Sequence, residues 1–159
     1  MSFAIEKWGL HERIALRILM TTGTKADRIL IGVMITSFLI SMWISNTATV
    51  MMLLSAVFAI INMTDRQMAD SDESKGLAKA LLIGLAYSAT IGGMATLVGT
   101  PPNMVFARAY QDAYPESGGI SFFKWLAIGF TIALMLLFVC YLVLRLTFIF
   151  KNSSAEVVV

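Results

Sequence analysis

The stretch SMWISNTATVMML (Ser41–Leu53) places three adjacent polar residues, Ser45, Asn46 and Thr47, inside a long apolar run. No charged residue occurs between Arg28 and Asp65. A bilayer core offers no hydrogen-bonding partner, so an interrupted helix is tolerated there only where protein buries it or a water-filled cavity borders it. The tripeptide therefore decides how this part of the chain folds.

The rest of the sequence has the composition of an integral membrane protein. It is 58% hydrophobic and 14% charged, with a mean hydropathy of +0.79. Uncharged runs cover residues 29–61, 80–107 and 125–144, and each is long enough to enter or cross a core about 30 Å thick. A tightly packed soluble helical domain is the alternative, but the length of the uncharged runs favours a membrane protein. The net charge of +2 gives no reason to expect a nucleic-acid partner.

The run 29–61 predicts a re-entrant helical hairpin. As one helix its 33 residues would be about 50 Å long, more than a single crossing needs. The run is too short for two complete crossings joined by a turn. Two limbs of half depth that meet at Ser45–Asn46–Thr47 fit the length better, and they enter and leave on the same side.

We expect an all-α membrane protein. Residues 6–20 have the pattern of an amphipathic helix at the membrane surface, although a linker helix on the aqueous side is also compatible. The expected parts are an interfacial helix with its lead-in (1–28), the re-entrant hairpin (29–61), a cytoplasmic connector (62–79), a discontinuous transmembrane helix (80–110), an external loop (111–122), a continuous transmembrane helix (123–150) and a cytoplasmic tail (151–159).

The basic residues support this topology. With a re-entrant hairpin, only Arg108 and Lys124 face outward, which divides the twelve basic residues ten against two. If 29–61 crossed the membrane once, the basic residues would be divided seven against five. The positive-inside rule therefore favours the hairpin, with both chain ends in the cytoplasm of the cell (inner) membrane. The ten basic residues on the cytoplasmic side are Lys7, Arg13, Arg17, Lys25, Arg28, Arg66, Lys75, Lys79, Arg145 and Lys151.

A break between two half-helices creates two binding ends. The first limb, ending near Ser45, presents unpaired carbonyls and a negative dipole end, which suit a cation. The second limb, starting at Asn46 or Thr47, presents N–H groups and a positive end, which suit an anion. Ser41 lies on the same face as Ser45 and adds a hydroxyl oxygen on the cation side. The alternative is that these side chains only join neighbouring helices.

A second interruption lies in IGGMATLVGTPPN (Ile91–Asn103). Thr100 can cap a half-helix whose first turn is Pro101–Pro102, where proline is tolerated. Gly99 lacks a side chain, so its carbonyl can approach an ion closely. A proline kink is the alternative. Paired discontinuous segments are typical of ion-coupled transporters, whose half-helices hold the substrate near the middle of the membrane.

The two motifs together resemble the N-terminal half, the first repeat, of the divalent anion–sodium symporter family. The resemblance implies sodium-coupled uptake of di- or tricarboxylates (succinate, malate, fumarate, or else citrate or sulfate) by a homodimer with an elevator movement. It implies a sodium site at Ser41, Ser45, Asn46 and Gly99. It also implies substrate contacts at Asn46, Thr47, Thr100 and Pro101.

Members of that family have two inverted repeats and a second Ser-Asn-Thr, whereas this chain has one such tripeptide. We therefore expect a single repeat that needs a C-terminal partner repeat. The alternative function is that of an incomplete, non-transporting membrane fragment or subunit, which must assemble with a separate C-terminal half. An enzyme is not expected, because the apolar runs contain no catalytic triad, metal-ligand set or carboxylate pair.

Overall fold

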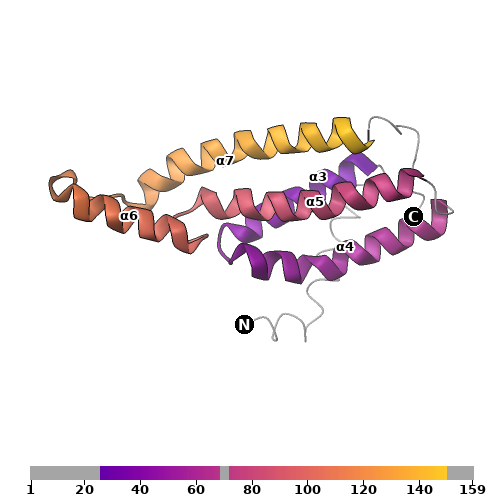
Figure 1. The fold of residues 1–159 in the computed structure, drawn as a ribbon, viewed down its shortest axis with the longest axis horizontal. Coiled ribbons are helices and arrows are strands. Elements are labelled where there is room, and N and C mark those ends of the chain that lie inside the picture. Colours follow the sequence, from indigo (N-terminus) through magenta and orange to yellow (C-terminus); the bar gives the residue numbers. More distant parts are fainter. Residues whose placement is uncertain (1–25, 69–71, 150–159) are drawn as a thin grey trace.

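A computed structural model describes residues 26–68 and 72–149, and every regular element within these ranges is helical (Figure 1). The expected interfacial helix, apart from its last residues, and the expected tail lie outside these ranges. The elements are α3 (Ala26–Ser41), α4 (Asn46–Met68), α5 (Asp72–Ala95), α6 (Pro101–Ala113), the 3₁₀ turn η1 (Pro115–Ser117), α7 (Phe122–Leu144) and the π-helical turn η2 (Arg145–Ile149).

Helices α3 and α4 form a hairpin around the polar tripeptide (Figure 1). The first helix ends at Ser41, four residues before the expected end near Ser45. It ends early because the N–H groups of Trp43 and Ile44 both donate to the Ile40 carbonyl, at 3.1 and 3.0 Å, and this tightens the last turn. The second helix begins at Asn46, where the Ser45 hydroxyl accepts from the Ala48 N–H at 3.4 Å as an N-cap.

The two limbs of the hairpin differ in length. Helix α3 has 16 residues and α4 has 23, which correspond to about 24 and about 35 Å. Residues Asn46–Thr64 are long and apolar enough to cross a membrane by themselves. Helix α4 therefore continues past residue 61, where the expected hairpin ends, because Asn62–Met68 contains neither glycine nor proline to end the helix. The expected connector 62–79 is helical at 62–68 and again from Asp72.

Helix α5 lies at the centre and packs against α3, α4 and α7 (Figure 1). It ends at Ala95, and α6 begins at Pro101 and runs onward past the tip of the hairpin for about 20 Å. The interruption expected in 91–103 is therefore present. Thr100 occupies the N-cap position in extended conformation, with prolines in the first turn, but its hydroxyl makes no capping hydrogen bond. The proline rings favour a helix start here, because their fixed φ suits the first turn.

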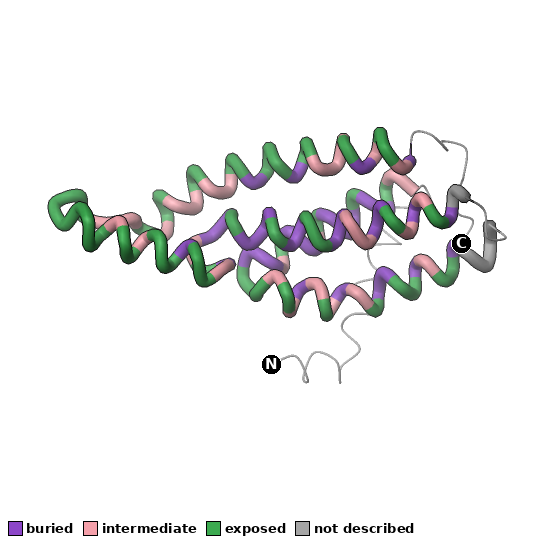
Figure 2. The backbone as a smooth tube through the Cα atoms, in the orientation of Figure 1, coloured by how far each residue is buried: buried purple, intermediate pink, exposed green. Residues whose placement is uncertain are grey.

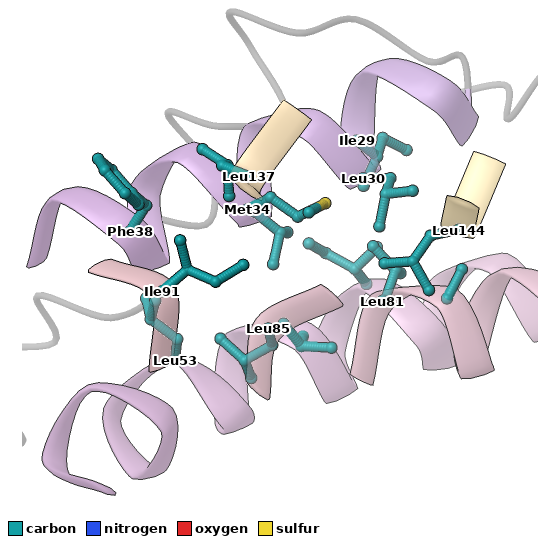
Figure 3. Packing of buried hydrophobic residues seen from close by; sticks show 14 of the residues in the cluster. Ile29, Leu30, Met34, Phe38, Leu53, Leu81, Leu85, Ile91, Leu137 and Leu144 are labelled. Atoms are coloured by element: carbon teal, nitrogen blue, oxygen red, sulfur yellow. The ribbon is translucent and has the colours of Figure 1, made fainter. Parts of the chain in front are cut away.

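The apolar core lies where α3, α4 and α7 meet α5. Figure 2 shows the buried positions gathered along the facing sides of α3 and α5, whereas α7 is largely exposed. Only 11% of the most apolar stretch of α7 is buried, so most of its surface is left for lipid or another chain. Figure 3 labels the main core residues, Ile29, Leu30, Met34, Phe38, Leu53, Leu81, Leu85, Ile91, Leu137 and Leu144.

In addition to α4, two helices of the described ranges are long and apolar enough to cross a membrane, Ser74–Ala95 and Phe122–Ile149. An ion pair joins the first and last helices of this bundle at one end. Arg145, in the π-helical turn after α7, lies 3.1 Å from the Asp27 carboxylate in the first turn of α3. The start of α3 and the end of α7 therefore lie at the same end of the molecule, as Figure 1 also shows.

Candidate functional site

Four helix ends converge where the hairpin tip meets the α5–α6 break. Helices α3 and α5 end there, and α4 and α6 begin there (Figure 1). The Thr96 hydroxyl donates to the Met42 carbonyl at 2.6 Å, which joins the break directly to the hairpin tip. Two negative dipole ends and two positive ones therefore lie close together.

No charged side chain of these helices compensates the four ends. The last turns of α3 and α5 contain no basic residue, and the first turns of α4 and α6 contain no acidic residue. Such charges are the usual way in which a helix end is stabilised. In these turns the dipole ends are therefore not offset by a charged side chain of their own helix.

Ser41 and Asn46 lie in contact between the ends of α3 and α5. The Ser41 hydroxyl oxygen is fully buried and lies 2.8 Å from Asn46 Oδ1 and 2.6 Å from the Ala89 carbonyl oxygen. A hydroxyl has one proton, so it can donate to only one of these acceptors at a time. When it donates to Ala89, its lone pairs and the Asn46 amide oxygen are both available to a cation.

Glycines allow the two interruptions to approach this closely. A Cβ atom on Gly92 would collide with the Phe38 backbone, and one on Gly93 would collide with Asn46 Oδ1. A Cβ atom on Gly99 would lie 2.5 Å from the Gly93 carbonyl oxygen. A side chain at Gly92 or Gly93 would separate α5 from the hairpin, and one at Gly99 would separate the two sides of the break.

The structure brings some of the predicted site residues together. Asn46, Gly99 and Thr100 all lie against Gly93, and Ser41 contacts Asn46. Ser45, Thr47 and Pro101 lie on the exposed side of the same helix ends, and none of the three is buried. Ser41, Asn46, Gly99 and Thr100 are therefore gathered, whereas Ser45, Thr47 and Pro101 line an open surface.

The sequence reasoning missed three polar residues of this region. Thr96 donates to a carbonyl of the hairpin tip and Asn103 to two carbonyls across the break, and their position within the quoted motif was the only signal. Thr49 is fully buried one turn into α4, and its hydroxyl has no hydrogen-bonding partner. None of the three follows from helix or turn propensities, because their partners depend on tertiary contacts.

The oxygen donors of the site lie apart from the hollow between α6 and α7. Within 26–68 and 72–149 there is no cluster of three or more His, Cys, Asp or Glu side chains that could hold a metal ion. The hydroxyl, amide and carbonyl oxygens of the site are neutral, hard ligands. A hollow of about 570 Å³ lies between α6 and α7, but its walls include none of the predicted site residues and are mainly apolar, with Lys124 as their one cation.

An all-helical membrane protein in which paired helix interruptions gather neutral oxygens has the architecture of an ion-coupled transporter. The chain belongs to the CitMHS family, described as "Citrate transporter", whose family model matches residues 1–155. The predicted transporter resemblance is thereby confirmed, and the members of this family to which the chain is similar are transporters rather than enzymes.

Two curated relatives show the closeness of the match. The chain is 40% identical over 148 residues to the sodium-dependent dicarboxylate transporter SdcS of Staphylococcus saprophyticus subsp. saprophyticus. It is 36% identical over 148 residues to the protein of the same name from Staphylococcus aureus strain NCTC 8325 / PS 47. Each match covers 91% of this chain but 28% of the relative, so the chain spans little more than a quarter of the length of these relatives.

Proposed function

We propose that the chain provides the first repeat of a carrier that couples sodium entry to the uptake of di- or tricarboxylates. The observation that supports this most strongly is the convergence of four uncompensated helix ends around Ser41, Asn46 and Gly99. Sodium binds on the side of the α3 and α5 carboxyl ends, at Ser41, Ser45, Asn46 and Gly99. The printed name of the relatives, sodium-dependent dicarboxylate transporter, supports the same ion and substrate class.

The substrate carboxylate binds on the opposite side of the tripeptide. The amino ends of α4 and α6 offer N–H groups and positive dipole ends beside Asn46, Thr47, Thr100 and Pro101. Thr47 and Pro101 are exposed on this surface, as residues that form one wall of an incomplete pocket should be. A C-terminal repeat, whether continuous with this chain or separate, supplies the other wall.

The hairpin enters the membrane from the cytoplasm and returns there. Helix α3, at about 24 Å, is shorter than the hydrocarbon core, and α6, itself about 20 Å long, runs onward past the hairpin tip. The ten-to-two distribution of basic residues supports the same orientation. The complete carrier works as a homodimer with an elevator movement, in keeping with the family resemblance.

Transport assays test this function. The chain alone, reconstituted in liposomes, should show no sodium-dependent uptake of succinate, malate or citrate, because one wall of the pocket is absent. Co-expression with the C-terminal remainder of the Staphylococcus saprophyticus relative should restore uptake that needs sodium and not potassium. Uptake by the chain alone would contradict the requirement for a second repeat, and a completed carrier indifferent to sodium would contradict the coupling.

A further inference from the structure

The α5–α6 break leaves carbonyl groups that need hydrogen-bonding partners. A helix end has four such carbonyls, and in a membrane they cannot rely on water. The Met94 carbonyl accepts from the Trp125 indole N–H of α7, at 3.2 Å. The carbonyls of Gly93 and Thr96 both accept from the side-chain amide of Asn103, at 3.0 and 2.8 Å.

Asn103 connects the two sides of the break. It lies in the first turn of α6 and is buried, and its side chain reaches back to residues seven and ten positions earlier. The amide nitrogen carries two protons, one for each carbonyl. An aspartate of the same shape has no such protons when ionised, and an alanine does not reach.

The two residues held by Asn103 also contact the hairpin tip. Gly93 lies against Asn46, Gly99 and Thr100, and the Thr96 hydroxyl donates to the Met42 carbonyl. Fixing the Gly93 and Thr96 carbonyls therefore fixes the start of α6 relative to Asn46. Gly99 lies between Thr96 and Asn103 in the sequence, so the same two hydrogen bonds restrict its position.

We infer that Asn103 is a positioning residue for the cation site, and that it holds Gly99 beside Ser41 and Asn46 without binding the ion itself. This inference rests on the proposed sodium site. It assigns the Asn103 amide to the Gly93 and Thr96 carbonyls, so that these two carbonyls are occupied and the ion is left to the oxygens of Ser41, Asn46 and Gly99.

Hydrogen–deuterium exchange of the full chain in lipid nanodiscs tests this inference. Sodium is titrated against choline at constant ionic strength, and exchange is followed in peptides covering 26–40, 41–47 and 93–103. In the parent chain, sodium should slow exchange in 41–47 and 93–103. Asn103→Asp should speed exchange in 93–103 without sodium and raise the half-protecting sodium concentration by about fivefold or more, because two hydrogen bonds are lost.

The exposed Asn62, in α4, offers a matched control, and Asn62→Asp should behave like the parent chain. If Asn103→Asp does not fold, Asn103→Ala gives the same comparison without an added charge. The inference is overturned if Asn103→Asp leaves exchange in 93–103 unchanged. It is also overturned if the variant speeds exchange in 26–40 as well as in 93–103 and leaves the half-protecting sodium concentration unchanged. If the parent chain shows no response to sodium, the proposed sodium site fails, and sodium-free exchange in 93–103 still decides whether Asn103 holds the break.

Discussion

At the scale of single residues, the candidate site depends on which oxygen receives which proton. Ser41 stands between two acceptors, the Ala89 carbonyl and the Asn46 amide, and has one proton to donate. A bound cation favours donation to Ala89, because the ion then takes the lone pairs of Ser41 and Asn46. At the proposed sodium site, the hydroxyl would therefore couple ion binding to the packing of α3 against α5.

Substitutions at the tripeptide should separate the ion from the substrate in the completed carrier. Ser41→Ala should mainly raise the sodium concentration for half-maximal uptake, whereas Thr47→Ala should mainly weaken substrate binding. Asn46→Ala should affect both. Each lost hydrogen bond to a charged group is worth about 1.5–3 kcal/mol, or roughly 10- to 150-fold in affinity. Substrate affinity at limiting and saturating sodium gives the measurement, with reciprocal cross-effects expected in equilibrium binding. Wild-type behaviour of all three variants would mean that these side chains only join helices.

Two buried threonines should respond oppositely to the same change. The Thr49 hydroxyl has no partner, so Thr49→Val should stabilise the chain by about 1 kcal/mol by removing an unsatisfied polar group. The Thr96 hydroxyl donates to the Met42 carbonyl at 2.6 Å, so Thr96→Val should destabilise it by a similar amount. Thermal unfolding in the same detergent compares the two variants. A destabilised Thr49→Val would show that this hydroxyl has a partner in the membrane.

At the scale of helices, the close approach of α3 and α5 depends on what each glycine faces. Gly92 faces the Phe38 backbone, which cannot move without moving the hairpin, whereas Gly84 faces the flexible side chains of Leu30 and Met34. Gly92→Ala should therefore destabilise the chain by about 2 kcal/mol or more. Gly84→Ala should stay within about 1 kcal/mol of the parent chain, because alanine favours a helix. Equal unfolding temperatures for the two variants would contradict this packing.

The interruptions were predictable from sequence, whereas their connections were not. A polar tripeptide and paired prolines disturb an apolar helix locally, so Ser45–Thr47 and Gly99–Pro102 lie at the ends of the two breaks that the structure shows, 42–45 and 96–100. The end of α3 at Ser41 and the continuation of α4 to Met68 depend on tertiary packing, which the sequence alone does not show. The contacts of Thr96 and Asn103 join residues 7 to 54 positions apart, so only the assembled fold shows them.

At the scale of the whole molecule, the depth of the hairpin tip is the feature to measure. Single cysteines on a Cys140→Ala background, at exposed Asn62, Thr147, Ser117 and Ser45, would report it through a membrane-impermeant thiol reagent. Asn62→Cys and Thr147→Cys should react from the cytoplasm, and Ser117→Cys from outside. Ser45→Cys should not react from outside if the hairpin is re-entrant. Outside labelling as fast as that of Ser117→Cys would mean that α3 and α4 cross completely.

The Asp27–Arg145 ion pair determines whether the chain between these residues crosses the membrane an odd or an even number of times. Because it joins the start of α3 to the end of α7, the chain between them crosses the membrane an even number of times, whether the hairpin crosses fully or turns back. After an even number of crossings the chain is again on the side of the membrane where it started. A second copy of this bundle attached directly would therefore have the same orientation as the first. An inverted copy therefore needs an odd number of additional spans between the two.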